Sequence, residues 1–410
     1  MNNTAPHPRA HRTVLSGGLV FDGTGTPPAE ADVLIEGERI LEIGTGLDAD
    51  EQIDVTGTTL LPGLFDCHVH VTMSGLDMMR HLAQPYSYQY YEAARNLGRT
   101  LDVGITTVRD AAGADAGVRK AVEDGLIDGP RLRISITALS QTGGHCDVWH
   151  PSGITTPFAI PTPGRPDSVV DGRENMRLRV REILRAGADC IKVCTTGGVA
   201  SPGDDPRHSH FRDDELTAMM DEVRAAGVHA LAHAQGADGI KNAVRAGVRS
   251  IEHGIYLDDQ GIEMMLESGT WLVPTLSAPL AVIRLAEAGA RIPEETVAKA
   301  REAAEAHADS FRRAVSAGVR IATGTDSGVG PHGENLGELV LMQAGGLSPV
   351  QVLAATTSSS ADLLGLGEAT GRLRPGLLAD IVVTDGTGLD LTTLPDRIRH
   401  VYKAGRRVRG

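Results

Sequence analysis

The periodicity of hydrophobic and polar positions differs between the two ends of the chain and its middle. Residues 13–60 contain short apolar runs that alternate with polar positions and stop at Gly-rich turns, as at 32–35 before 36–38. Period-two alternation with β-branched residues is typical of antiparallel strands. Residues 368–410 repeat this pattern. We therefore predict one small β-sandwich domain built from 13–60 plus 368–410, preceded by a disordered or extended N-terminus at 1–12.

A second pattern fills the middle of the chain. A helical stretch ends in a small residue and a glycine, and an apolar strand follows. This occurs at 101–110, 185–194, 225–233, 245–253, 267–275 and 316–326. Glycine at the end of a helix adopts the left-handed conformation without a Cβ clash. Regular alternation of helices and apolar strands predicts parallel βα units.

An opening strand near 61–70 and another at 131–137 bring the number of predicted parallel strands to eight. Eight such units most simply close into a (β/α)8 TIM-like barrel, here over residues 61–367. A doubly wound open sheet is the alternative, but no Gly-x-Gly-x-x-Gly follows a first strand. The expected fold class is α/β, a barrel with a small β-sandwich domain.

Composition narrows the range of partners. The formal net charge of −14 disfavours nucleic acid and anionic membranes. The chain begins with a polar, Pro-containing stretch unlike a signal peptide, and no apolar run approaches the ~20 residues of a membrane span. Its four cysteines form no CxxC pair. We expect a cytoplasmic protein with a small-molecule substrate and no nucleic-acid or membrane partner.

Potential metal ligands recur at the predicted strand ends. His68 and His70 lie two apart, so in a strand they face the same side, and two such imidazoles suit one divalent metal. An isolated His-x-His is more often a pair of solvated or hydrogen-bonded histidines. However, active sites of barrels lie at the carboxyl ends of the strands. The repeated occurrence there predicts a metal centre formed by His68, His70, Lys192, His233, His253 and Asp326.

Lys192 needs a chemical explanation, because a protonated lysine repels a cation. If its amine takes up carbon dioxide, it becomes a carbamate, an anionic group that can bridge two metals. Cys190 and Cys194 share the face of Lys192 by the strand period. They could act as thiolate ligands, but small cysteines that fill a barrel interior are the favoured interpretation.

Several motifs together resemble one superfamily. They lie at 61–70, 106–110, 143–145, 191–193, 233–236, 250–254, 324–326 and 371–383. On these motifs the sequence is similar to the amidohydrolase superfamily, and within it to imidazolonepropionase-related hydrolases and Xaa-Pro dipeptidases (prolidases). The resemblance covers nearly the whole chain, roughly residues 13–405.

The resemblance implies a binuclear metal hydrolase that cleaves an amide-type C–N bond by attack of a metal-bridging hydroxide. The implied cofactors are two divalent metal ions, usually zinc in this family. The first would be held by His68, His70 and Asp326, the second by His233 and His253, with carbamylated Lys192 bridging both. Asp326 would also carry the proton to the leaving nitrogen.

Other residues are candidates for catalysis and substrate binding. His145 and Tyr256 are nominated as donors to the oxyanion. Trp149 and Phe158 lie in the long connection 145–171 and suggest an apolar wall over the site. A substrate carboxylate would need a cation, for which Arg109 and His210 are candidates beside Arg207, Arg212 and His208.

The expected substrate is a dipeptide of Xaa-Pro type or an N-acyl amino acid. An aryl amide, carbamate or urea is the near alternative, because Cys146 and the segment 208–210 depart from the family pattern. A mononuclear deaminase would want His-x-x-Glu, whereas Gly236 stands three residues after His233. A non-catalytic scaffold that kept the barrel should have lost metal ligands, and none of the six is missing here. An even-numbered homo-oligomer is also expected.

Overall fold

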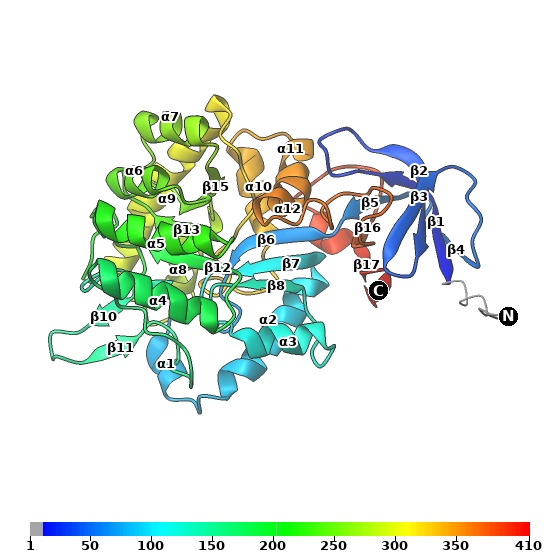
Figure 1. The fold of residues 1–410 in the computed structure, drawn as a ribbon. Helices are drawn as coiled ribbons and strands as arrows, with labels where there is room; N and C mark the ends of the chain where they lie inside the picture. The colour runs from blue at the N-terminus through cyan, green and yellow to red at the C-terminus, as the bar shows by residue number, and fades with distance from the viewer. Residues whose placement is uncertain (1–10, 202) are drawn as a thin grey trace.

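The computed structural model describes residues 11–201 and 203–410, and it contains a large α/β body with a sheet at one end (Figure 1). The expectation of a disordered or extended segment at 1–12 falls mainly on residues 1–10, which lie outside the described residues. Arg12 already begins the first strand.

Both ends of the chain contribute to one eight-stranded sheet. Its order is β18-β17-β16-β5-β1-β2-β3, with β4 beside β1. The strands are β1 (Arg12–Val20), β2 (Ala29–Glu36), β3 (Arg39–Gly44), β4 (Glu51–Asp54), β5 (Thr58–Pro62), β16 (Ile381–Asp385), β17 (Ile398–Lys403) and β18 (Arg406–Arg409). Strands β5 and β16 join the two ends, antiparallel, with Ile381 opposite Pro62. The division of this eight-stranded sheet into the two layers of a sandwich stays a prediction, and so do the domain boundaries.

The body contains two parallel sheets. One has the order β6 (Leu64–Val69), β7 (Ile105–Asp110) and β8 (Arg131–Ile134). The other contains β15 (Trp271–Val273), β14 (Ser250–His253), β13 (His229–Ala234), β12 (Cys190–Cys194) and β9 (Ala138–Leu139). All pairs within both sheets are parallel, as predicted from the alternation of helices and strands.

Helices surround these strands (Figure 1). They are α1 (Met78–Leu82), α2 (Tyr88–Asp102), α3 (Ala116–Glu123), α4 (Arg173–Arg185), α5 (Asp213–Ala225), α6 (Ala237–Ala246), α7 (Asp259–Ser268), α8 (Ser277–Glu287), α9 (Glu294–Ala317), α10 (Gly337–Ala344), α11 (Pro349–Ala354) and α12 (Ser360–Leu363), with a π-turn at Ala355–Ser359 and a 3₁₀ turn at Leu394–Arg397. A small hairpin, β10 (Asp147–Trp149) and β11 (Thr155–Pro157), projects from the body. In the described part of the chain, none of the helices is long and apolar enough to cross a membrane.

The segment that follows Gly318 lies between the two parallel sheets. The backbone N–H of Ala322 donates to Leu272 of β15 at 3.0 Å, and that of Cys67 in β6 donates to Thr323 at 2.8 Å. The hydrogen-bonded strands of the body form two separate parallel sheets. The fold that the structure establishes is therefore a mixed α/β fold.

Glycines end the helices as the sequence pattern predicts. Gly247, Gly269 and Gly318 cap α6, α7 and α9 in the left-handed conformation, with φ of 95°, 69° and 86°. Each reverses the chain directly into the next strand segment. Because the strands are parallel, their carboxyl ends gather on one side of the body, and the polar residues that follow them are brought together there.

Candidate metal centre

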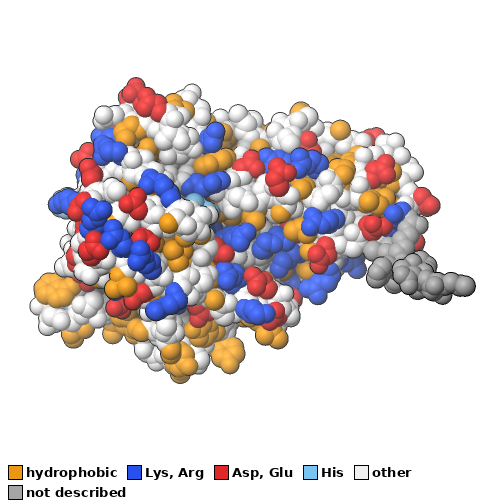
Figure 2. Space-filling model, viewed as in Figure 1, with side chains coloured by type: hydrophobic (Ala, Val, Ile, Leu, Met, Phe, Trp, Pro, Cys, Tyr) orange, Lys and Arg blue, Asp and Glu red, His pale blue; other side chains and the backbone are white. Residues whose placement is uncertain are grey.

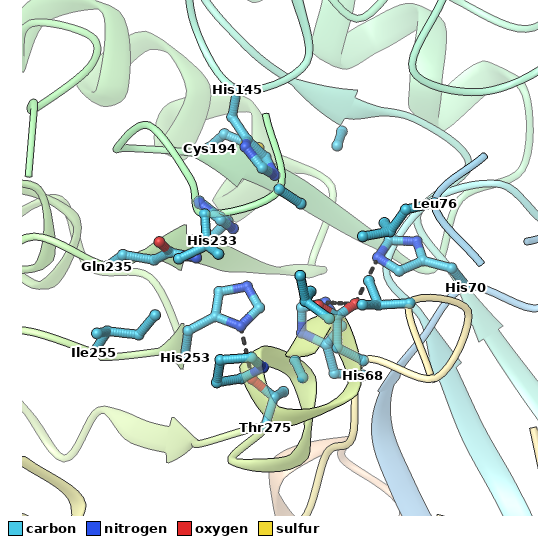
Figure 3. A pocket seen from close by; sticks show the side chains of 18 of the residues that line it. His68, His70, Leu76, His145, Cys194, His233, Gln235, His253, Ile255 and Thr275 are labelled. Carbon is cyan, nitrogen blue, oxygen red and sulfur yellow. Dashed lines mark hydrogen bonds and ion pairs between the residues drawn. The ribbon is translucent and has the colours of Figure 1, made fainter. Parts of the chain in front are cut away.

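A cavity of about 760 Å3 lies at the carboxyl ends of these strands, and we call it the inner cavity (Figure 3). Its polar lining residues are His68, His70, His145, Lys192, Cys194, His233, Gln235, His253, Thr275, His307 and Asp326. Its apolar lining includes Leu76, Phe158, Val199, Ile255, Val282 and Val329. All six residues predicted as metal ligands therefore line one space.

His68, His70 and Asp326 form the tightest group. One ligand atom from each lies within 4.8 Å of the others. Oδ1 of Asp326 lies 3.2 Å from Nε2 of His70 and 3.6 Å from Nε2 of His68. Two imidazole nitrogens and a carboxylate oxygen that converge in this way form a donor set suited to zinc and similar divalent metals.

The opposite ring nitrogens of these histidines face acceptors. Nδ1 of His68 lies 2.7 Å from the Glu252 carboxylate, and Nδ1 of His70 lies 2.8 Å from the carbonyl of Ala112. A nitrogen that faces such an acceptor carries the proton, which leaves the lone pair on Nε2. Both imidazoles therefore present a free Nε2 toward Asp326, as metal-ligating histidines do.

His233 and His253 lie beside this group (Figure 3). Their ring centroids are 4.6 Å apart, and the ring of His253 is 5.0 Å from that of His68. Nδ1 of His253 lies 2.7 Å from Oγ1 of Thr275. Nε2 of His233 donates to the carbonyl of Gly197 at 3.0 Å, which leaves Nδ1 of His233 with the lone pair.

The backbone at two of these residues is unusual. His253 has φ of 72° and Asp326 has φ of 60°, which is the left-handed region that non-glycine residues rarely adopt. Simple alternation would place Glu252 and His253 on opposite faces of β14. The positive φ turns the His253 side chain into the cavity although Glu252 also points inward, toward His68. Strained backbone of this kind is common at functional sites.

Lys192 is buried in the middle of the histidines. Among the described residues, its amine has no hydrogen-bond partner, and neither does Oδ1 of Asp326. Burial lowers the pKa of Lys192, and this effect outweighs the nearby Glu252 carboxylate. A buried polar atom without a partner is costly, so both atoms indicate that a further group belongs between them. The residues present fit divalent metal binding.

The charge states of three of the four ligand histidines suit the same purpose, whereas the Asp326 carboxylate outweighs burial and raises the pKa of His70. Burial lowers the pKa values of His68, His233 and His253 well below the ordinary value, which keeps these imidazoles neutral. Burial raises the pKa of Asp326, but the close imidazole of His70 and the positive charge of Lys192 outweigh it and hold the pKa below its usual range. Neutral imidazoles and an ionised carboxylate are the forms that bind metals.

Arg109 is not available to a substrate, which corrects the prediction made from the sequence. Its side chain is fully buried, and its guanidinium donates to the carbonyl of Cys67 at 2.7 Å and to Glu252 at 2.8 Å. Glu252 in turn accepts from His68. Arg109 therefore neutralises the carboxylate that orients a ligand, on the side of the strands away from the cavity opening.

The other predicted site residues divide into two sets. His145 and Phe158 line the inner cavity, and the ring of His145 stacks on His233 with centroids 4.0 Å apart. Trp149, Tyr256 and His210 do not line it.

The surroundings of each of these three side chains explain why it does not line the inner cavity. Trp149 is 56% exposed on the hairpin, so the expectation that it walls the site is wrong. His210 is buried behind Gly144, and burial lowers its pKa to about 4, so it is a poor cation for a carboxylate. The Tyr256 ring lies against the guanidinium of Arg207, 4.2 Å from its centroid, while its neighbour Ile255 lines the cavity. A catalytic role for Tyr256 stays a prediction.

Two buried carboxylates that support the site had not been singled out from the sequence. Glu252 orients His68, as described above. Asp66 accepts from the backbone N–H of His68 and from Thr325 and Asn335. Both stand directly beside a ligand or two residues from one, within the motifs at 61–70 and 250–254. An acidic residue inside an apolar strand was the signal that could have revealed them.

The fold and the site together define a hydrolase of the metal-binding type, with its chemistry at the carboxyl ends of parallel strands. A model of the amidohydrolase family matches residues 59–408. The chain belongs to the amidohydrolase family and is an enzyme. Members of this family generally bind divalent metals, in agreement with the His-His-Asp group.

Relatives of known name cover almost the whole chain. Ochratoxinase of Aspergillus niger is 33% identical over an alignment of 420 residues, which covers 97% of this chain and 87% of that protein. A solved prolidase in complex with N-methylphosphonate-L-proline is 36% identical, with a TM-score of 0.90 over 97% of this chain and 99% of the other. A Xaa-Pro dipeptidase with bound methionine is 31% identical, with a TM-score of 0.89 over 97% and 100%. The resemblance stated from the motifs is confirmed.

Proposed function

We propose that this amidohydrolase is a binuclear metal-dependent enzyme that hydrolyses an amide-type C–N bond of a dipeptide of Xaa-Pro type or of an N-acyl amino acid. The observation that carries the proposal is the convergence of four imidazoles and one carboxylate around the unpartnered amine of Lys192. Two similar solved structures are named as a prolidase and a Xaa-Pro dipeptidase, which supports the substrate class.

The donor atoms sort into two sets. His68, His70 and Asp326 would hold one metal, and His233 and His253 the other. Zinc is the metal that we propose. When bound, the two metals supply an activated water at neutral pH and polarise the carbonyl of the scissile bond.

Lys192 would bridge the two sets as a carbamate. Only a neutral amine reacts with carbon dioxide, and burial already lowers the pKa of Lys192. The product carries a negative charge on two oxygens. It would therefore replace a buried cation that repels metals with an anion that attracts them.

Three residues of the chain would act on the substrate. The Asp326 carboxylate takes the proton from the attacking water and passes it to the leaving nitrogen, which then departs as a neutral amine. His145 lines the cavity beside His233, where its ring can donate to the carbonyl oxygen as negative charge develops. Tyr256 is proposed as a second donor.

An aryl amide, carbamate or urea is the second candidate substrate class. Lys192 is the only lysine, and no arginine occurs, among the described residues that line the inner cavity. Arg109, the first candidate for a carboxylate clamp, is committed to Glu252. A lining that offers no arginine and no lysine besides the proposed metal ligand favours substrates that lack a carboxylate. The similarity to ochratoxinase, at 33% identity, is compatible with either class.

We further propose that the strands of the two parallel sheets, with β8 and β9 counted as one and the segment 321–327 as the eighth, close into a (β/α)8 barrel over residues 61–367. Isolated parallel bridges from Leu272 to Ile321 and from Val69 to Ser327 support this closure. The small β-sandwich domain of 13–60 plus 368–410, the cytoplasmic location and the even-numbered homo-oligomer remain proposals.

Metal analysis and a substrate screen test the function. Fully active protein should contain two metal equivalents per chain, and fewer than one would contradict the binuclear proposal. The screen compares Xaa-Pro dipeptides and N-acyl amino acids with aryl amides, carbamates and ureas. Turnover of the first group alone supports the main proposal, and turnover of the second group alone supports the alternative.

A further inference from the structure

A second cavity adjoins the inner cavity, and we call it the outer cavity. It is open to solvent and has a volume of about 1020 Å3. Five residues line both cavities, so the two share part of their walls: Met73, Leu76, His145, Phe158 and Ala200. The rest of its lining comes from α1, from the hairpin β10–β11 and from the start of α9, with Val148, Ile292 and Thr296 among them.

Phe158 stands at the junction. Its ring centroid is 6.1 Å from that of His70 and 6.0 Å from that of His145, and the Phe158 and His70 rings meet edge to face. The other side of Phe158 packs on Ala112, Ala138, Cys146 and Cys194. Phe158 therefore forms one apolar surface that begins beside a metal ligand and continues into the outer cavity.

The lining of the outer cavity is mainly apolar. Besides the shared residues, it includes Met79, Val148, Ile292 and Pro293. Two charged side chains take part, Asp77 and Arg291, and Asp77 is occupied as the cap of α1, where its carboxylate accepts from the backbone N–H of Arg80. Exposed apolar surface of this kind gains free energy when a ligand covers it.

The surface near the opening is apolar as well. Met79 is 69% exposed, and Ile154 on the hairpin is 63% exposed. Figure 2 shows apolar side chains gathered on the lower part of this face, where Figure 1 places α1 and β10–β11. Apolar side chains at an entrance suit the passage of an apolar group into the site.

The orientation of a substrate follows from the residues that each cavity contains. Asp326, the proposed proton donor to the leaving nitrogen, lines only the inner cavity. His145, the proposed donor to the carbonyl oxygen, lines both. A substrate whose nitrogen faces Asp326 and whose carbonyl faces His145 would therefore extend its acyl group past Phe158 into the outer cavity.

We propose that the outer cavity is a binding site for a bulky apolar acyl group, aryl or branched alkyl, and that Phe158 is the specificity-determining side chain against which this group packs. The proposal rests on the proposed function and narrows its substrate class to N-acyl compounds with a large apolar acyl part.

The test compares two substrates with the same leaving group, N-(2-naphthylacetyl)-L-proline and N-acetyl-L-proline, on the metal-loaded enzyme. We expect the ratio of their kcat/KM values to favour the naphthyl compound. Val148→Asp and Ile292→Asp, which place a charge in the outer cavity, should each lower this ratio about tenfold or more. Val148→Ile, which keeps an apolar side chain at this position, should keep the wild-type ratio. Leu178→Asp is the matched control, because Leu178 is an exposed apolar residue on α4 that lines neither cavity, and it should leave the ratio unchanged.

Calorimetric titration with 2-naphthylacetate and acetate separates this proposal from the proposed function. If the enzyme hydrolyses neither substrate, the proposed function on N-acyl prolines fails. Tighter binding of naphthylacetate that Val148→Asp removes would still support the outer cavity. Equal affinities of the two acids, or a substrate ratio that both Asp variants leave unchanged, would overturn the proposal. A Phe158→Ala variant that keeps the wild-type ratio would remove Phe158 as the determinant.

Discussion

Two regions of the active site are built in opposite ways. The floor consists of the strand ends that carry His68, His70 and Asp326, and the wall consists of residues 146–171, which include the hairpin β10–β11. In the floor, Glu252 accepts from His68, Asp66 accepts from Thr325, and both carboxylates are fully buried. In the wall, Phe158 is half-buried and Trp149 is 56% exposed.

This difference separates chemistry from selection. Buried ion pairs and hydrogen bonds allow the floor a single geometry, because any displaced partner would leave an unpaired buried charge. The wall contributes apolar surface. Its contribution to binding depends on how much of that surface the substrate covers, more than on the direction of the individual contacts. We therefore expect substitutions in the floor to reduce metal binding and catalysis for every substrate, and substitutions in the wall to change preference among substrates.

The largest effect is expected from the floor itself. Asp326→Asn removes a metal ligand charge and the proton carrier together, so kcat should fall about 1,000-fold or more. Steady-state kinetics and metal analysis of the purified variant measure both losses. Asp259→Asn, at a carboxylate whose side chain is 87% exposed, is the control. Retention of more than a tenth of the wild-type rate would contradict the role of Asp326.

Lys192 should make the reactivation of the metal centre depend on pH. Burial lowers its pKa from the ordinary 10.5, so at a given pH more of its amine is neutral than in free lysine, and that fraction rises with pH. Reactivation of metal-stripped enzyme by zinc and bicarbonate should therefore become faster as pH rises from 6 to 8.

The matched variant is Lys192→Arg, whose guanidinium stays protonated and cannot form the carbamate. We expect it to retain about one hundredth of the wild-type activity or less, with no response to bicarbonate. Wild-type reactivation that is equally fast in buffer free of carbon dioxide would argue against the carbamate.

Glu252→Gln tests the support beneath the floor. The variant weakens the acceptor that orients His68 and leaves Arg109 without its buried counter-ion, so metal affinity should fall about 10- to 100-fold. The free energy of unfolding should also decrease, by about 3 kcal/mol. Competition with a chelator and urea denaturation measure the two effects. Glu123→Gln, on the surface of α3, should change neither, and an unchanged affinity in Glu252→Gln would remove Glu252 from the metal centre.

Tyr256 lies outside both regions, against Arg207 and next in sequence to Ile255 of the inner cavity, and a smaller effect is expected there. Tyr256→Phe should lower kcat several-fold with unchanged metal content, because the variant removes one donor while the floor stays intact. His145→Gln, whose position lines the cavity, should cost more. Identical kinetics of wild type and Tyr256→Phe would exclude the tyrosine from catalysis.

The smallest effect is expected at the exposed end of the wall. Trp149→Ala should change kcat/KM less than about twofold and the free energy of unfolding by less than about 0.5 kcal/mol, because most of its side chain already contacts water. The measurement is a parallel kinetic and denaturation series with Phe158→Ala. A large loss in Trp149→Ala would show that the hairpin closes over the site during turnover.

Local sequence patterns predicted much of the fold. Gly-capped helices before apolar strands indicated parallel βα units, and Gly247 and Gly318 end their helices as expected. Alternation within β12 was also predicted correctly. Ile191 and Val193 pack in the main core cluster, whereas Lys192 and Cys194 line the cavity. These features depend on neighbours in sequence, which is why a sequence reveals them.

Contacts between distant residues were not predictable in the same way. Arg109 looked like a carboxylate clamp, but its partner Glu252 lies 143 positions away. Trp149 and Phe158 are both aromatic and lie in the same loop. The hairpin nevertheless turns Trp149 outward and Phe158 toward His70. Nothing in the local pattern separates these cases, because burial depends on which segment packs against them.

The sequence alone therefore determined the identity of the candidate ligands, the succession of helices and strands, and the membership of a hydrolase family. The tertiary structure decided how those ligands meet. His253 and Asp326 enter the cavity through left-handed backbone, and His68 presents Nε2 because Glu252 holds its Nδ1. The physical reason is that residue type and spacing set chemical capacity and local conformation, whereas burial, tautomer and backbone strain arise only when distant strands pack together.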